Sequence, residues 1–133
     1  MIKNFPVKVL SDNDDPLTRR IIASAIEVHK RLGPGLLEKL YQEAMAIEMQ
    51  LVNLKVEKNV KIPVEYKGKP IGDYFIDLLV EDRVILELKS VERHDPIFEA
   101  QILSYMKLTG KKVGLLINFN SKMVKDGIKR FVL

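Results

Sequence analysis

Three charged residues interrupt two apolar segments in the middle of the chain, and their types suit metal chemistry. Asp77 lies within the largely apolar run 74–80. Glu87 and Lys89 lie within a second run, 84–90. Strand residues two apart share a face, so Glu87 and Lys89 point the same way if this run is a strand. Unpaired charge is costly to bury, so such residues pair or bind an ion. The alternative is an ordinary salt bridge between Glu87 and Lys89 on a half-exposed strand.

The turn between these two segments decides whether Asp77 joins the other two residues. A two-residue turn over 81–82 would place Asp77 opposite Leu86, whereas a three-residue turn over 81–83 would place it opposite Glu87. Opposite side chains on one face have Cβ atoms about 4.5–5.5 Å apart. Two carboxylates at that separation can bind one hard cation such as Mg²⁺. We therefore predict the three-residue turn, with the nearby lysine offsetting negative charge or orienting a water.

Helical periodicity predicts three helices around these strands. An Asp-Pro pair beginning at Asp15 has the types expected at a helix N-cap and first turn, and the helix ends at the break 33–35. A further Asp-Pro pair at Asp95 begins a helix that ends at Gly110. The helix between these two has an apolar stripe that is predicted to face the core. The members of this stripe are Leu37, Leu40, Tyr41, Ala44, Ile47 and Leu51.

Strands are predicted where the period changes from about four residues to two. Their ranges are 60–66, 71–80, 83–90 and 113–117, and a short helix and strand follow within 121–133. Pro63 favours an edge position or an irregularity for the first of them. The order α-α-β-β-β-α-β with a small tail predicts an α/β sandwich, in which helices flank a central mixed β-sheet.

Composition excludes several classes of protein. The chain has 133 residues, of which 47% are hydrophobic and 30% charged, and it contains no cysteine. This length predicts one domain, 1–133, with an N-terminal extension over 1–14. The lack of cysteine excludes a disulfide scaffold, a thiolate zinc site and a cysteine nucleophile. No apolar run reaches the ~18 residues of a membrane helix, and no signal-peptide core is present, so the expected location is the cytoplasm.

The positive charge of the chain is concentrated near its C-terminus. The net charge is +4, yet the segment 107–133 alone contains seven basic residues and one acidic residue. A basic end suits a polyanionic partner such as nucleic acid. A solvated, lysine-rich surface would give the same pattern.

The pattern D-x9-E-x-K in a β-hairpin followed by a helix resembles the active site of the PD-(D/E)xK nuclease superfamily. The matching residues are Asp77, Glu87 and Lys89, although Ile76 stands where the superfamily's name has proline. The resemblance implies a restriction-endonuclease-like fold. It also implies hydrolysis of phosphodiester bonds with Mg²⁺ or Mn²⁺ as cofactor, in DNA rather than RNA.

A second pattern extends the resemblance to nearly the whole chain. The segment 35–41 fits G-x-x-E-x-x-Y. Together with the segments 29–35 and 114–120, it resembles the GxxExxY protein family, which is grouped with the same superfamily. The resemblance covers roughly residues 29–130.

The resemblance implies roles for individual residues. The implied metal ligands are Glu38, Asp77, Glu87 and the backbone carbonyl of Leu88. Lys89 would position or deprotonate the attacking water, or stabilise the transition state. Tyr41 would hold Glu38 or contact substrate. Gln101 and Tyr105 match the Q-x3-Y motif of RecB-type and lambda-exonuclease-type members, where the pair supports the active site or the substrate strand.

Purely structural roles for these residues and other functions for the chain stay open. Glu38 alone would be a surface acid that compensates the helix dipole, and Tyr41 and Tyr105 alone would be core aromatics. The predicted function is a metal-dependent nuclease whose basic segment holds the nucleic-acid backbone. The alternatives are a nucleic-acid-binding module with little or no cleavage and a protein-interaction subunit that kept the fold. No membrane partner is expected, and a homodimer is left open.

Overall fold

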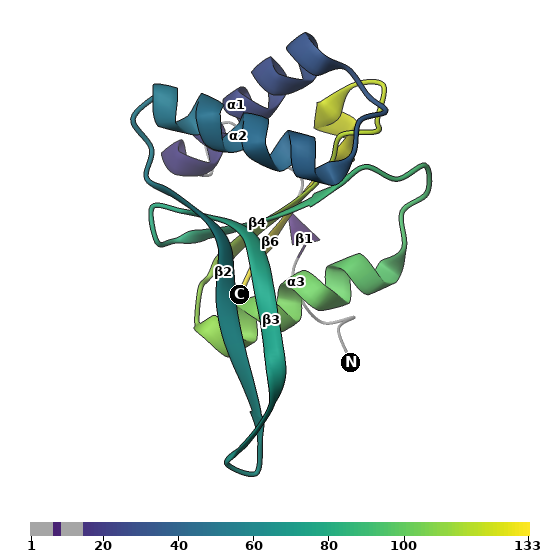
Figure 1. The fold of residues 1–133 in the computed structure, drawn as a ribbon. Coiled ribbons are helices and arrows are strands. Elements are labelled where there is room, and N and C mark those ends of the chain that lie inside the picture. The colour runs from purple at the N-terminus through teal and green to yellow at the C-terminus, as the bar shows by residue number, and fades with distance from the viewer. Residues whose placement is uncertain (1–6, 9–14) are drawn as a thin grey trace.

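Helical layers cover both faces of one β-sheet, as Figure 1 shows. The structure is a computed structural model, and it describes residues 7–8 and 15–133. Its helices are α1 (Pro16–Leu32), α2 (Glu38–Leu51), α3 (Pro96–Thr109) and the short 3₁₀ helix η1 (Val124–Gly127). Its strands are β1 (Val7–Lys8), β2 (Val56–Tyr66), β3 (Lys69–Val80), β4 (Val84–Lys89), β5 (Val113–Asn118) and β6 (Ile128–Val132). The predicted α/β architecture is confirmed. None of the described helices has the length and hydropathy needed to cross a membrane.

The sheet is mixed, with the strand order β1-β6-β5-β4-β3-β2. Among the described strands, only β4 and β5 pair in parallel, and α3 connects them as a crossover. Strand β2 lies at one edge, as Pro63 predicted. At the other edge, Val7–Lys8 pairs with β6, which was not predicted. The remainder of the expected extension 1–14 lies outside the described residues.

The predicted Asp-Pro caps begin α1 and α3. The side chain of Asp15 accepts a hydrogen bond from the Leu17 N–H at 3.1 Å, and that of Asp95 from the Ile97 N–H at 3.0 Å. Each cap satisfies a backbone donor that has no partner inside the helix. Helix α3 ends at Gly110, whose left-handed φ of 74° favours glycine. These caps fix the ends of both helices against the sheet.

Tyr41 holds the loop between α1 and α2. Gly33 and Gly35 in this loop have positive φ values of 69° and 100°. The Tyr41 hydroxyl donates to the Gly33 carbonyl at 2.5 Å and accepts from the Leu36 N–H at 3.2 Å. The ring stacks on Phe119 with 4.4 Å between centroids. The buried phenol therefore fixes the loop that leads into α2.

The prediction that the apolar stripe of α2 faces the core is wrong for four of its six members, whereas Tyr41 is buried and Ala44 packs against the core. Its members Leu37, Leu40, Ile47 and Leu51 are between 50% and 76% exposed. The buried face of α2 consists of Tyr41, Met45, Ala46 and Met49. Both faces of this helix contain apolar residues at helical spacing, and spacing alone does not tell which face packs. The flexible methionine side chains fill the irregular space above the sheet.

Two apolar clusters fill the spaces on either side of the sheet. Along β4, Leu86 and Leu88 belong to the cluster beneath α1 and α2, whereas Ile85 belongs to the cluster beneath α3. Residues along a strand alternate between faces. Glu87 and Lys89 continue the Ile85 series and therefore lie on the α3 side.

The orientation of α2 predicts unequal effects of two substitutions on the same helix. Met49→Ala should lower the free energy of unfolding by about 2–5 kcal/mol, because it leaves a cavity in the core. Ile47→Ala, at a position that is 58% exposed, should change it by less than about 0.5 kcal/mol. Urea unfolding followed by circular dichroism measures both values. A large loss for Ile47→Ala would contradict the observed orientation.

Candidate active site

Strands β3 and β4 pair in the register expected for a three-residue turn. The paired residues are Leu78 with Leu86, Leu79 with Ile85, and Val80 with Val84. The turn over 81–83 is therefore confirmed. The same register, continued by one residue, places Asp77 opposite Glu87.

Contacts made by the turn explain its length. Glu81 and Asp82 both have positive φ values, 53° and 55°. The Glu81 carboxylate accepts a hydrogen bond from the Lys55 N–H at 2.6 Å, and Asp82 pairs with Lys111 at 3.2 Å. These partners are remote in sequence, and they tie the turn to the elements on both sides of it.

Beyond the last paired residues, the two carboxylates replace backbone hydrogen bonds between the strands. Asp77 Oδ2 accepts from the Leu88 N–H at 2.8 Å. Glu87 Oε2 accepts from the Asp77 N–H at 2.9 Å. One oxygen of each carboxylate is thus engaged by the opposite strand. The first of these bonds also brings the Leu88 backbone next to Asp77.

Burial raises the pKa values of both carboxyls, and nearby negative charges add to its effect. Burial is the largest cause for Glu87, the charge of Asp77 is the next, and together they raise the pKa of Glu87 to about 8. Burial likewise raises the pKa of Asp77, and the Leu88 N–H and the charge of Lys89 act against it. Two like charges in a half-dry site disfavour double ionisation. The pair therefore favours either a proton or a cation.

Strand β3 is kinked at Asp77. Ile76 packs in the cluster beneath α3, whereas Leu78 packs in the cluster beneath α1 and α2. Residues two apart in a regular strand would share a face. On the neighbouring strand β2, Asn59 has a positive φ of 54° at the same level. The kink places Asp77 where the two helical layers meet.

Gln42 is a residue at this site that was not predicted. Its side-chain Nε2 donates to the Asp77 carbonyl and to Asn59 Oδ1, each at 2.9 Å. Gln42 lies four residues after Glu38, on the same side of α2. That spacing was the available signal, but a glutamine on an amphipathic helix is ordinarily a surface residue.

Glu38 lies at the first position of α2 and faces the site from its exposed rim. With Asp77 and Gln42 it lines a hollow of about 420 Å³, which Lys39 and Asn59 complete. Its charge contributes to the raised pKa values of Asp77 and Glu87. Tyr41, by contrast, is fully buried and bonds the preceding loop, so it supports this region from beneath and does not reach the hollow.

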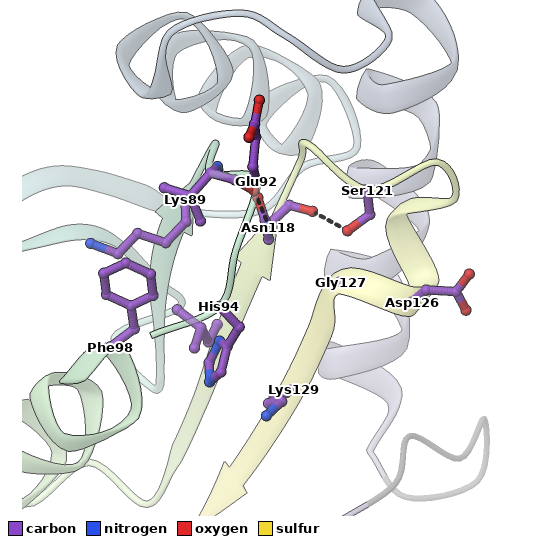
Figure 2. A pocket seen from close by; sticks show the side chains of 11 residues that line it. Lys89, Glu92, His94, Phe98, Asn118, Ser121, Asp126, Gly127 and Lys129 are labelled. Atoms are coloured by element: carbon purple, nitrogen blue, oxygen red, sulfur yellow. Dashed lines mark hydrogen bonds between the residues drawn. The ribbon is translucent and has the colours of Figure 1, made fainter. Parts of the chain in front are cut away.

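Lys89 lies beside the carboxylates but its ammonium is turned toward α3. Its Nζ is 4.4 Å from the centroid of the Phe98 ring. Figure 2 shows the side chain extending along a second hollow, of about 290 Å³, toward Phe98. His94 and Lys129 also line this hollow, and both pair with Glu99 on α3, at 2.5 and 2.7 Å. The charge of Lys89 lowers the pKa values of both carboxyls, so the three residues form one electrostatic unit.

Tyr105 on α3 closes the site from the opposite layer. It is 6% exposed, and its ring lies 5.1 Å from that of Tyr74. Burial raises the pKa of Tyr105 to about 12, and the charges of Glu87 and Asp77 add to this effect. Its hydroxyl is therefore protonated near neutral pH. Gln101 is half-buried one turn earlier on the same side of α3.

The basic C-terminal segment does not form one continuous surface. Lys111 pairs with Asp82 in the β3–β4 turn, at the end of β4 that lies away from Lys89. Arg130 is buried, with Asp15 at 3.9 Å. Lys129 instead lines the hollow next to Lys89. Strand β5 separates the lysines that precede it from Lys122 and Lys125, which follow it, so only part of the positive charge lies near the carboxylates.

Comparison with known families agrees with this arrangement. The model of the PD-(D/E)XK nuclease superfamily matches residues 15–131. The chain belongs to this superfamily. The match begins at the N-cap of α1 and ends within β6. It therefore includes Asp77, Glu87 and Lys89, which lie where β3 and β4 separate, a place called the β3–β4 fork below. No curated protein and no solved structure matched the chain.

Members of the PD-(D/E)XK superfamily generally use divalent metals, and the donors at the fork suit such an ion. Asp77 and Glu87 supply hard carboxylate oxygens, and their raised pKa values reflect negative charge that a cation would neutralise. Among the described residues, no three His, Asp or Glu side chains are grouped closely enough to hold an ion by themselves. A cation bound by this pair therefore needs further ligands from water, a backbone carbonyl or a moved side chain.

The raised pKa of Glu87 predicts that the metal-free protein loses stability as the pH rises. In the unfolded chain Glu87 releases its proton near its ordinary value of 4.5, but in the folded protein it does so only at about 8. Between these values the folded state binds more protons, so the free energy of unfolding falls. Glu87→Gln keeps an oxygen for the Asp77 N–H and cannot ionise. It should therefore show a smaller fall and exceed the wild type in stability at about pH 8.

Urea midpoints of the two proteins at about pH 5 and about pH 8, measured with EDTA, check this prediction. Equal falls in the wild type and in Glu87→Gln would show that the pH dependence has another origin.

Proposed function

We propose that this chain is a metal-dependent nuclease of the GxxExxY type that hydrolyses phosphodiester bonds of DNA. The observation that carries the proposal is the pair Asp77 and Glu87, held by backbone N–H groups at the β3–β4 fork of a PD-(D/E)XK fold. Lys89 follows Glu87 on the same face of β4 and shares its electrostatic environment. This combination supports metal-assisted hydrolysis over simple structural pairing.

The α1–α2 loop supports the GxxExxY assignment. Gly35 has a positive φ of 100°, which suits glycine. Glu38 then begins α2 at the rim of the hollow that Asp77 also lines. Tyr41 returns to the loop and bonds the Gly33 carbonyl. The glycine of the pattern thus shapes the loop, the glutamate lines the hollow, and the tyrosine bonds the loop.

In the proposed mechanism, Asp77 and Glu87 would hold Mg²⁺ or Mn²⁺, with Glu38 and the Leu88 carbonyl as further ligands. When bound, such an ion makes water more acidic and stabilises negative charge on the phosphate. Lys89 orients the attacking water or stabilises the charge that develops on the phosphate. For Lys89 to do so, its ammonium leaves the Phe98 ring and turns toward the carboxylates.

The hollow beside Lys89 supports a nucleic-acid partner. Lys89 and Lys129 both line it, and in Figure 2 the carboxylates of Glu92 and Asp126 point away from these two lysines. We propose that lysines at this end of β5 contact the nucleic-acid backbone, independently of sequence. The lysines at the opposite end of β5 are not assigned such a contact.

A nucleic-acid-binding module with little cleavage is the second candidate. It is favoured by the distance of the Lys89 ammonium from the carboxylates, since it rests over Phe98 and forms none of the described ion pairs with them. In this case DNA binding would weaken steeply with added salt while cleavage stayed absent.

Cleavage of labelled single-stranded, duplex, flapped and branched DNA, with and without Mg²⁺ or Mn²⁺, tests the nuclease proposal. Asp77→Asn and Lys89→Ala should each lower the rate at least about 100-fold, because the first removes the charge of a metal ligand and the second a charge that acts on the reacting phosphate or its water. Asp73→Asn is a matched control on the same strand, since Asp73 is exposed and pairs only loosely with Lys61 at 3.8 Å.

The outcomes separate the candidates. Metal-dependent cleavage that is lost in both site variants and kept in Asp73→Asn would support the proposed site. A wild-type protein that neither cleaves DNA nor binds Mn²⁺ would contradict the nuclease. Cleavage that survives in both site variants would point to a different site.

A further inference from the structure

We propose that Gln42 is a positioning residue for Asp77: its side-chain amide joins α2 to the kink in the β2–β3 hairpin and so fixes where the Asp77 carboxylate lies. The inference rests on the proposed function, in which Asp77 is a central carboxylate. Gln42 acts on the backbone of Asp77 and not on its carboxylate, because its Nε2 donates to the Asp77 carbonyl at 2.9 Å.

The kink is a property of both strands of the hairpin. Val60 and Ile76 are paired with each other and pack in the cluster beneath α3. Val56 and Val80 are also paired, but they pack with the cluster beneath α1 and α2. In regular strands all four would lie on one face, because their spacings are even. The hairpin therefore changes faces between these two pairs, at the level of Asp77.

The kink removes a ladder pair and leaves polar groups that need partners. The register includes Lys58 with Leu78 and Val60 with Ile76, but it does not include Asn59 with Asp77. A half-buried carbonyl without a partner is costly. Gln42 supplies the hydrogen-bond donor for the Asp77 carbonyl that the β2–β3 ladder does not supply.

Asn59 completes the same arrangement. Its φ of 54° lies in the left-handed region, which asparagine visits more readily than most residues. Its side-chain oxygen accepts from Gln42 Nε2 at 2.9 Å. The two protons of one amide group thus bind both strands at the kink, so Gln42 holds the two halves of the irregularity together.

Gln42 and Glu87 together clamp the Asp77 backbone. The N–H of Asp77 is held by Glu87 on β4, and its carbonyl by Gln42 on α2. With both groups engaged, the peptide units on either side of Asp77 have little freedom to rotate. The side chain therefore keeps the direction in which Asp77 Oδ2 meets the Leu88 N–H. Loss of Gln42 frees one of these two peptide units.

Amide hydrogen exchange of the metal-free protein, measured by NMR, tests the inference without relying on activity. In Gln42→Ala, the Asp77 and Leu88 amides should exchange at least about tenfold faster, because local opening at the kink becomes easier. Amides in α3 and β5 should keep their wild-type rates. Gln50→Ala is the matched control, since Gln50 is an exposed glutamine on the same helix.

Two outcomes of this measurement would overturn the inference. The first is unchanged exchange at Asp77 and Leu88. The second is an equal acceleration throughout the sheet, which would mean a general loss of stability. Asn59→Gly provides a second variant, because glycine tolerates the positive φ but removes the acceptor. It should accelerate the same two amides, and the double variant should add less than the sum of the two effects.

Mn²⁺ binding and cleavage kinetics connect the inference to the site. By calorimetry, Gln42→Ala should bind Mn²⁺ about tenfold more weakly than the wild type, as is typical when a residue that orients a ligand is lost. For DNA cleavage, kcat should fall while KM stays near the wild-type value. If the wild type binds no Mn²⁺ and cleaves no DNA, the proposed function fails, and hydrogen exchange still decides the role of Gln42.

Discussion

Two carboxylates that replace backbone carbonyls as hydrogen-bond acceptors between β3 and β4 are the constraint on which this structure depends. Where β3 and β4 separate, Asp77 and Glu87 each accept an N–H from the opposite strand. The sheet therefore fixes the separation of the two side chains, which no flexible loop could do as well. The cost is that two carboxyls lie close together in a partly buried place: burial raises the pKa values of both, and the charge of Asp77 raises that of Glu87 further. Such a site is incomplete without a proton or a cation.

Helix α2 serves this pair through two neighbouring faces. Glu38 and Gln42, four residues apart, face the hollow that Asp77 lines. Tyr41 and Met45, also four apart, are buried against the rest of the fold. The first face supplies charge and hydrogen bonds to the site, and the second anchors the helix that carries them. The Tyr41 hydroxyl also ties the preceding loop, so the position of Glu38 follows from core packing.

The sequence predicted those features that depend on local chemistry or on a single register. The Asp-Pro pairs begin helices because an N-cap acceptor and a preset φ act within one turn. The three-residue turn followed from the requirement that Asp77 and Glu87 meet, and that requirement left only one register. The superfamily was recognisable because its charged residues interrupt segments that are otherwise apolar.

Features that depend on packing between distant elements could not be predicted. Both faces of α2 contain apolar residues, and only the sheet beneath selects the face with Met45 and Met49. Gln42 and Asn59 are ordinary surface types whose pairing depends on a kink with no local marker. The charge of the C-terminal segment looked continuous along the chain, but β5 separates the lysines that precede it from Lys122 and Lys125, which follow it.

The site divides into a fixed part and an adjustable part, and this division bears on how it could work. Asp77 and Glu87 are held by the backbone of two strands, and Asp77 is held again from α2. The side chains of Lys89 and Glu38 are not held in this way. The Lys89 ammonium rests on the Phe98 ring, and Glu38 lies exposed at the start of α2. In the proposed function, an arriving cation or phosphate would therefore meet a preset pair of ligands, and only the long side chains at its rim would need to move. Those movements cost little, because cation–π contacts near a surface are weak, about 0.5–1 kcal/mol. In that function the pair Asp77 and Glu87 would set where hydrolysis occurs, and Lys89 and Glu38 would respond to what binds there.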